Sequence, residues 1–538
     1  MGRTSAVSRT SAVVSSLFAV ALALNLGSTS GCGGSHGGSL FGDGGASSGG
    51  GSSGGTSSGG LFGGSSSGTG SSGASSSGGQ PVQCPSGAQC NVSCSGGGTT
   101  SISGKIYDPA MKDPLYNITI YVPGGPLTAL PKGVPTGAAA CNCGALFSSG
   151  AVASTASGVD GSFKLTNAPV GKAIPLVAQV GKWRKVISVD TTQCADTAVP
   201  DKSFALPGTL TGAGANDDMP DIAVSTGSAD TLECLMKRMG IPDSEYVAGA
   251  AATGHVHVFS GGKSGGGGGG GGNHPGTPEN PPMPGAPASS ASLWDSQADL
   301  MPYDILLLSC EGAETYDANP PALESYLNAG GRAFASHYHY AWFSGPIDTK
   351  GTATYSAPAD WGTNLATWSD NSNGNGQGPD DGEIVQTLNG STKPFAKGQA
   401  LDQWLGLVGA LGPPAAAGDL PIYQPRYNAV VGPGNKPSQP WINDKGTANT
   451  MYFSFDTPVN APVDPSTGEP NYCGRAVFSD LHVAGSPTTT DKPPPPGGCE
   501  ATDLSPQEKA LEFMLFDLSS CVIPDTVAPP DGGVPVVQ

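Results

Sequence analysis

The chain has 538 residues, and its 84 glycines and 48 prolines are too many for a chain that is folded throughout, so we expect two folded domains with linkers. Charged residues make up only 12% of the sequence, and the net charge is −19. This acidic balance, without any basic stretch that carries interleaved aromatic residues, excludes a nucleic-acid-binding surface.

The N-terminus has the features of an export signal. Arg3 and Arg9 precede an apolar run from Ala12 to Leu24, which is too short for a membrane span, and small residues follow. We therefore predict a signal peptide over residues 1–31. The sequence Thr29-Ser30-Gly31-Cys32 resembles the lipobox of bacterial lipoproteins, in which the cysteine becomes the lipidated first residue. An ordinary cleavage nearby is the alternative, because Thr29 stands where that pattern prefers Leu.

The resemblance implies an exported, lipid-anchored protein of the cell envelope whose membrane partner is reached through Cys32. Gly33 is similar to the residue found in lipoproteins sent to an outer membrane. Residues 32–80 consist almost entirely of Gly and Ser, so we expect a disordered tether that lets the folded part stand off the membrane.

Twelve cysteines in an exported chain favour disulfides over reactive thiols. If Cys32 is lipidated, an odd number remains, and at least one cysteine is free or pairs with another chain. Residues 81–99 contain Cys84, Cys90 and Cys94 without any histidine, which favours a small disulfide knot over a metal site.

Residues 100–206 show short alternating segments separated by turn signals, which predict an antiparallel β-sandwich. Asp160-Gly161 is expected to make a hairpin-type turn, and Gly181 separates strand candidates at 174–180 and 183–189. The segments SGKIYDP, YNITIYVP and GVDGSFKLTNAPVG resemble the carboxypeptidase regulatory-like domains, which are transthyretin-like sandwiches with a structural or adhesive role. This chain inserts Pro123 to Ser154, which holds Cys141 and Cys143, and the sequence leaves their disulfide partners open, with Cys194 as one candidate.

Residues 217–522 alternate strand-like and helical segments, as expected of an α/β domain. We predict strands at 221–225, 255–259, 304–309, 332–336, 451–456 and 474–480, and helices at 229–238, 321–328 and near 395–411. Ser505-Pro506-Gln507-Glu508 combines an N-cap, a proline at the first helical position and a capping box, and so begins a final helix.

Two insertions interrupt this domain, at about 260–290 and 342–450. The first contains the glycine run 261–272, which lacks the Gly-Lys-Ser/Thr ending of a phosphate loop and is linker-like. We expect the second, with the helix near 395–411 and a strand at 428–431, to form a lid or a binding wall beside the strand ends. The tail, residues 523–538, is expected to be disordered.

The strands at 221–225, 304–309, 332–336 and 474–480 are expected to form a parallel-rich sheet with helices on both faces. Ligand sites in such sheets lie beyond the carboxyl ends of the strands. The polar residues at those ends are Cys310, Glu311, His337, His339, Asp480 and His482.

Three chemistries fit this set. His337, His339, Asp480 and His482 are candidate ligands for zinc or a similar ion. Cys310 is a candidate nucleophile with a histidine base, although we favour a disulfide between Cys310 and Cys234. Alternatively the strand ends bind a ligand without chemistry, with Tyr338, Tyr340 and Trp342 suited to a polar, ring-containing ligand such as a carbohydrate.

The segments YDILLLSCEG, ALESYLNAGGRAFASH, MYFSFDTP and GRAVFSDLH, with the closing helix, resemble the class I glutamine-amidotransferase-like superfamily and its ThuA-like branch. The resemblance implies a flavodoxin-like fold and a strand-end pocket. In the amidotransferases a nucleophilic cysteine follows the strand that corresponds to 332–336, whereas this chain has His337 there. The His-x-Glu partner is also absent, with Asp480-Leu481-His482 near its place.

These departures count against glutamine hydrolysis. We therefore expect a non-catalytic domain that binds a saccharide-like ligand through Glu311, His337, His339, Asp480 and His482. The alternatives are a hydrolase or metal-dependent enzyme that uses Cys310, His337 or His482, and a purely structural envelope protein.

Overall fold

The structure, a computed structural model, describes residues 82–526 apart from gaps at 138–139, 262–282, 348–353, 371–375, 377, 466–467, 487–490 and 493. The predicted signal peptide, the lipobox, the Gly/Ser tether, most of the glycine run and most of the tail therefore lie outside the described residues. All described residues belong to one unit, Ser75–Gln538. Within them, no helix combines the length and the apolar character that crossing a bilayer requires.

The N-terminal strands form two small sheets. β2 (Thr119–Pro123), β3 (Ala151–Ala156), β5 (Gly171–Val180) and β6 (Trp183–Thr191) make an antiparallel sheet in the order β3-β2-β5-β6. β1 (Ser101–Lys105), β4 (Ser162–Thr166) and β7 (Asp196–Ala198) make a second one in the order β4-β1-β7. Because β1 and β7 are parallel, the prediction of a wholly antiparallel arrangement was wrong in this detail.

Two turns between these strands were predicted from the sequence, and the structure confirms one of them. Val180 pairs with Trp183 across the two-residue turn at Gly181, as the spacing predicted. Asp160-Gly161 is not a hairpin turn, because β3 pairs with β2 whereas β4 pairs with β1, so this turn carries the chain from one sheet to the other.

The segment Pro123 to Ser154 is only partly an insertion. It ends in β3, which pairs along β2 and is therefore part of the sheet. Before β3, Val134 packs into the core beneath the large sheet, and Cys141 forms a disulfide with Cys473. This segment thus ties the N-terminal sheets to the rest of the chain.

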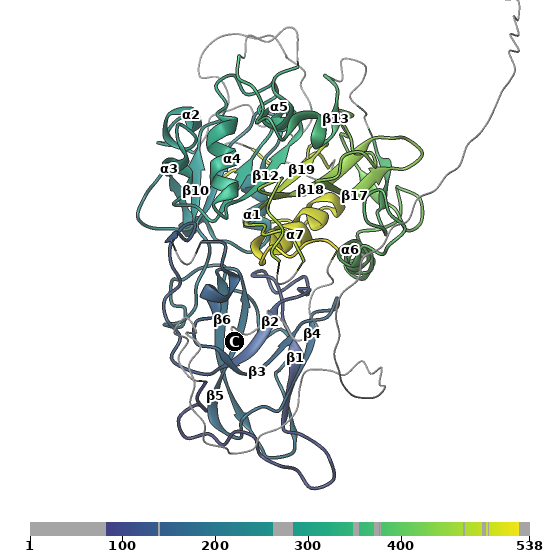
Figure 1. The fold of residues 1–538 in the computed structure, drawn as a ribbon. Helices are drawn as coiled ribbons and strands as arrows, with labels where there is room; N and C mark the ends of the chain where they lie inside the picture. Colours follow the sequence, from purple (N-terminus) through teal and green to yellow (C-terminus); the bar gives the residue numbers. More distant parts are fainter. Residues whose placement is uncertain are drawn as a thin grey trace, which may run out of the picture. The chain divides into compact units, whose positions relative to one another are not determined.

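The large sheet has ten strands in the order β15-β14-β17-β18-β19-β12-β11-β8-β10-β9. Figure 1 labels β17, β18, β19, β12 and β10, which follow one another across the sheet. Its parallel half comprises β8 (Ile222–Ser225), β9 (Tyr246–Ala248), β10 (Val256–Phe259), β11 (Ile305–Leu308), β12 (Arg332–Ser336) and β19 (Gly474–Ser479). Its antiparallel half comprises β14 (Asp380–Ile384), β15 (Leu420–Ile422), β17 (Ser438–Asp444) and β18 (Thr450–Thr457).

The predicted neighbours β8, β11, β12 and β19 are adjacent and parallel. Alternate residues of β11 enter different cores, with Leu307 on one face of the sheet and Leu306 on the other. Both cores are apolar, which explains the unbroken apolar run of this strand.

Helices cover both faces of the parallel half. α1 (Leu232–Arg238) and α7 (Pro506–Ser519) pack into the core that contains Leu307, whereas α3 (Gln297–Leu300) and α4 (Pro320–Asn328) pack into the core that contains Leu306. α7 begins with the predicted capping box, in which Ser505 and Glu508 each bond to the other's backbone. The fold is therefore mixed α/β, with few helices for the size of its sheet.

One longer helix remains, α6 (Ala396–Leu407). The other elements are short: η2 (Cys143–Phe147), η3 (Asp243–Glu245), α2 (Ser289–Ser292), η4 (His337–His339), α5 (Tyr340–Ser344), η5 (Gly362–Asn364) and the strand pair β13 (Thr367–Trp368) and β16 (Ala429–Val430).

The segment 342–450 was expected to be a lid or a wall, with one helix and one strand. It contains that helix, α6, and that strand, β16, but it also supplies β14, β15 and β17 to the edge of the large sheet. Much of it therefore extends the core. Its strands gave no clear pattern because prolines stand within them, at Pro421 and Pro440.

Four disulfides lie within the described residues: Cys84–Cys90, Cys94–Cys194, Cys141–Cys473 and Cys234–Cys499. Residues 81–99, where a small disulfide knot was expected, contain the local bridge Cys84–Cys90. Cys94 instead bonds to Cys194, which lies between β6 and β7. Cys521 is also disulfide-bonded, and Cys310 is a free, buried cysteine. Among the described residues, Cys310 therefore fits the expectation of at least one unbridged cysteine.

Candidate functional site

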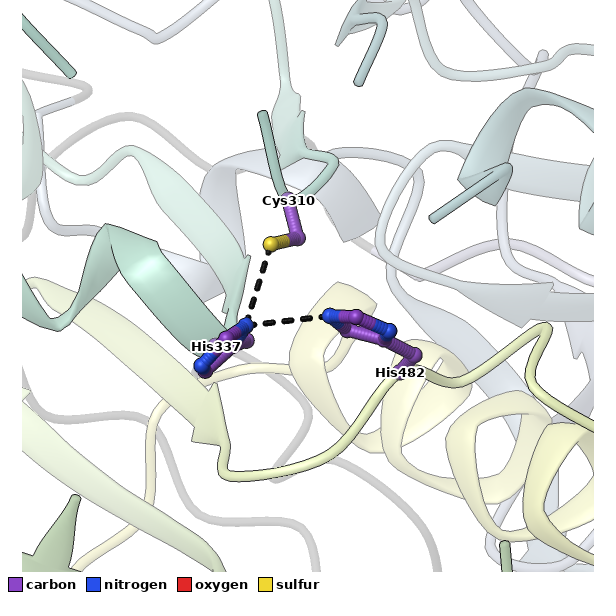
Figure 2. A group of neighbouring side chains, drawn as sticks. All are labelled: Cys310, His337 and His482. Atoms are coloured by element: carbon purple, nitrogen blue, oxygen red, sulfur yellow. Dashed lines mark hydrogen bonds between the residues drawn. The ribbon is translucent and has the colours of Figure 1, made fainter. Parts of the chain in front are cut away.

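Three side chains from three strand ends meet at the carboxyl edge of the parallel sheet (Figure 2). Cys310 follows β11, His337 follows β12 and His482 follows β19. Nδ1 of His337 lies 3.2 Å from Sγ of Cys310 and 3.0 Å from Nε2 of His482. The three residues are 0%, 3% and 3% exposed, so this Cys-His-His cluster is buried.

The sheet topology explains why these residues meet. β8 and β11 are neighbours in the sheet. After β8 the chain forms β9 and β10 on one side of it, and it then crosses to form β11 on the other side. Open α/β sheets place their sites at such a reversal of strand order. The cluster lies beside it, on the ends of β11, β12 and the adjoining β19.

His337 has a strained backbone. Its φ is +43°, in the left-handed region that non-glycine residues seldom adopt. Such strain persists where surrounding contacts fix it, and it concentrates at functional positions. Here it turns the chain sharply from β12 into η4 and points the imidazole at Cys310.

The loop that carries His482 is held by buried polar groups. Both oxygens of the Asp230 carboxylate accept hydrogen bonds from this loop, from the amides of Val483 and Ala484 at 2.9 Å each. Nε2 of Gln507 donates to the carbonyl oxygens of His482 and Val483, at 2.6 Å each. The imidazole of His482 is therefore presented by a fixed backbone.

Two further residues contact His482 from the segment before β16. Nη2 of Arg426 lies 3.2 Å from Nδ1 of His482, and Oε1 of Gln424 lies 2.9 Å from the same nitrogen. Arg426 donates to Nδ1 when this nitrogen is bare, whereas Gln424 accepts from Nδ1 when it carries a hydrogen. Nδ1 of His482 therefore has a hydrogen-bond partner in either neutral tautomer, Arg426 in one and Gln424 in the other.

Sequence reasoning missed Asp230, Gln424 and Arg426. Asp230 precedes α1 in a loop, and the other two lie in the irregular stretch between β15 and β16, where no periodicity marks them. The one signal in the sequence was the Arg itself, which stands in a Pro-rich stretch of a chain with few charges.

His339 and Asp480, expected as metal ligands, serve other contacts. Nδ1 of His339 lies 3.2 Å from the carbonyl oxygen of Ser336, and its Nε2 lies 3.9 Å from Oε1 of Glu311. Oδ2 of Asp480 accepts from the amides of Asn428 and Ala429 at 2.7 and 2.8 Å. The set of converging donors is therefore Cys310, His337 and His482, in place of the four residues expected from the sequence.

Burial dominates the ionisation of the cluster. It raises the pKa of the Cys310 thiol to about 12. Burial, followed by the neighbouring His482 and Arg426, lowers the pKa of His337 well below its ordinary value. At neutral pH the thiol keeps its proton and His337 is neutral, which disfavours a thiolate nucleophile in the protein as it stands.

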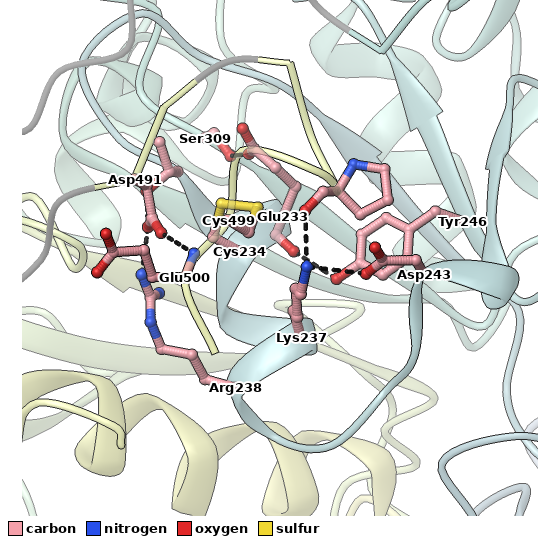
Figure 3. Close-up of a disulfide and its surroundings, with 12 residues drawn as sticks. Glu233, Cys234, Lys237, Arg238, Asp243, Tyr246, Ser309, Asp491, Cys499 and Glu500 are labelled. Atoms are coloured by element: carbon pink, nitrogen blue, oxygen red, sulfur yellow. Dashed lines mark hydrogen bonds and ion pairs between the residues drawn. A yellow bond between two sulfur atoms is a disulfide. The ribbon is translucent and has the colours of Figure 1, made fainter. Parts of the chain in front are cut away.

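The preference for a disulfide between Cys310 and Cys234 was wrong. Cys234, on α1, is bonded to Cys499, and Figure 3 shows this bridge beside Arg238 and Asp491. Arg238 also pairs with Glu508 at the start of α7, at 2.6 Å. The bridge and the ion pairs fasten the segment around residue 499 to α1, which leaves Cys310 unbridged.

The aromatic residues expected to line a sugar site are mostly in the core. Tyr340 and Trp342 are both 0% exposed, and Tyr338 is half-buried. Two cavities of about 610 and 670 Å³ in the described structure are lined by other segments, at 210–221 with 244–255 and at 385–392 with 431–443.

Comparisons with known proteins add little. No family model matches the chain, and no curated protein matches it. One matching solved structure, a type II cohesin–X-dockerin complex from Acetivibrio cellulolyticus, is 13% identical over 28% of this chain and 78% of that chain, with a TM-score of 0.13. That score supports no conclusion on fold or function.

Proposed function

We propose that this chain is an exported, membrane-anchored protein whose α/β domain binds a metal ion through Cys310, His337 and His482. One observation carries the proposal: donor atoms from three separate strand ends converge, with 3.2 and 3.0 Å between neighbours. A metal with bonds of about 2.0 to 2.3 Å to nitrogen and sulfur holds its donors about 3.3 to 3.8 Å apart, so these side chains need to separate by only about 0.3 to 0.6 Å to bind it.

The supporting groups fit the same role. A metal-binding histidine donates its other ring N–H to an acceptor, which fixes the tautomer. Oε1 of Gln424 stands 2.9 Å from Nδ1 of His482 and serves as that acceptor when Nε2 binds metal. Asp230 holds the loop, so the ligand is preorganised.

The remainder of the proposal rests on the sequence. The lipobox-like ending at Cys32 points to a lipid anchor in the outer membrane, and the disulfides of the described region suit an oxidising compartment. We further propose that β1–β7 form a transthyretin-like spacer and that the domain after it is flavodoxin-like and related to the ThuA-like branch.

A saccharide-like ligand stays a prediction, and the burial of Tyr340 and Trp342 gives it no support. A hydrolase that uses the same centre would need a path for its substrate to a cluster that is at most 3% exposed. If the centre binds no metal, the structural envelope protein becomes the better description.

The test is metal content. The purified protein is incubated with an equimolar mixture of zinc and copper salts, passed through a desalting column and analysed by mass spectrometry of the elements. We expect one metal ion per chain, and none in Cys310→Ala, His337→Ala or His482→Ala. His255→Gln is the matched control, because His255 lies away from the cluster. Its Nδ1 is 2.6 Å from Oε2 of Glu245. Equal metal content in all variants would refute the proposal.

A further inference from the structure

From the donor set and its burial we infer that the ion held by Cys310, His337 and His482 is monovalent copper. This inference rests on the proposed metal-binding function and names the ion.

The first argument is coordination number. Structural zinc sites use four protein ligands, and catalytic ones use three with an open position for water. Among the described residues the cluster offers three converging donors, one sulfur and two imidazole nitrogens. Their burial, at 0% to 3% exposure, leaves no solvent-facing fourth position. Cu(I) accepts two or three soft ligands, and thiolate and imidazole are ligands that it favours.

The second argument is charge. When Cu(I) binds, the S–H bond of Cys310 breaks, a Cu–S bond forms and the proton leaves to solvent. The bound ion and the thiolate together then carry no net charge.

A divalent ion would instead add one unit of positive charge to the same place. Arg426, whose guanidinium lies 3.2 Å from His482, already carries a positive charge there. Asp230 and Asp480 are the buried carboxylates nearby, and both are engaged by backbone amides. Because burying an extra charge is costly, the site discriminates against zinc.

The third argument concerns the two residues that contact Nδ1 of His482, which are Gln424 at 2.9 Å and Arg426 at 3.2 Å. When Nε2 of His482 is a ligand, Nδ1 carries the hydrogen and donates it to Oε1 of Gln424. Gln424 is thus a positioning residue that fixes the tautomer of the ligand.

The experiment is an anaerobic competition for copper in the presence of ascorbate. Cu(I) is supplied as its bicinchoninate complex, and the fall in the colour of the complex reports transfer to the protein. We expect transfer of one equivalent, no transfer to Cys310→Ala and unchanged transfer to His255→Gln. A parallel titration with zinc and a chromophoric zinc chelator is expected to show at least 100-fold weaker binding.

A second variant separates a loss of copper binding from a loss of the fold. Gln424→Leu removes the acceptor but no ligand, and we expect Cu(I) affinity to fall about 10- to 100-fold with the thermal midpoint of the metal-free protein unchanged. One equivalent of zinc that excess Cu(I) cannot displace would overturn the choice of copper and leave the proposed function intact. If neither metal binds, both fail.

Discussion

Arg475 offers the sharpest test of how the sheet that carries the site is held together. It is 2% exposed on β19, and Nε and Nη2 donate to Asp456 on β18 at 2.6 and 3.1 Å. Nη1 donates to Asp517 on α7 at 2.8 Å, and Nη2 also donates to Asp525 at 3.0 Å. One guanidinium therefore joins two strands, the last helix and the segment after it.

The perturbation is Arg475→Met, which keeps the apolar stem and removes the charge. Asp456 and Asp517 then remain buried, and Lys397, at 2.8 Å from Asp517, compensates only part of the loss. Removing one partner of a buried ion pair costs about 3–5 kcal/mol, and we expect the free energy of unfolding to fall by that amount.

The assay is equilibrium unfolding in urea, followed by tryptophan fluorescence. Lys172→Met is the matched control, because the side chains of Lys172 and Asp190 are 85% and 58% exposed and such pairs contribute little. The free energy of unfolding of Arg475→Lys should lie between those of the native protein and Arg475→Met. A lysine keeps the positive charge but not the several N–H donors of the guanidinium. A loss below about 1 kcal/mol for Arg475→Met would refute the reasoning, because it would equal that of a surface pair.

Three further predictions concern single groups. Cys310 is buried, which raises the pKa of its thiol to about 12, so it should resist iodoacetamide in the native protein and react after denaturation. The masses of the peptides report the labelling, and labelling of the native protein would contradict the burial of Cys310. Burial raises the pKa of Asp108 from 3.8 to about 6, so between these values the folded state binds a proton that the unfolded state has lost, and stability should fall as pH rises through this window. In urea unfolding at a series of pH values, Asp108→Asn should lose less stability across this window than the native protein does, and parallel curves would count against this prediction. Ser505→Ala removes the capping box of α7 and should lower the free energy of unfolding by about 1 kcal/mol, whereas Ser203→Ala, in an exposed turn, should not.

The strands with unbroken apolar runs were predictable from sequence. β8, β11, β12 and β19 are covered on both faces, so each reads as a short apolar block and their adjacency follows from the order of strands and helices. β9 and β15 have only three residues each, and β15 contains a proline, so neither gave a usable signal. Of the antiparallel half, β18 was predicted, whereas β15 and β17, which contain prolines, and β14 were missed.

The candidate site was predictable in location and only partly in composition. The rule that sites lie at carboxyl strand ends brought His337 and His482 together correctly. It could not separate the residues whose side chains turn inward from those that bond to nearby backbone, as Asp480 does with Asn428. Nor could it pair cysteines, because the partner of Cys234 stands 265 residues further along the chain.

The bond between Cys141 and Cys473 spans 332 residues of sequence, which includes most of the large sheet. A protease that cuts the chain once anywhere between these two positions would produce two polypeptides that still travel as one molecule until a reductant is added. A single nick would therefore neither separate the strands that carry the Cys-His-His cluster from the N-terminal sheets nor change the apparent mass of the protein on a non-reducing gel.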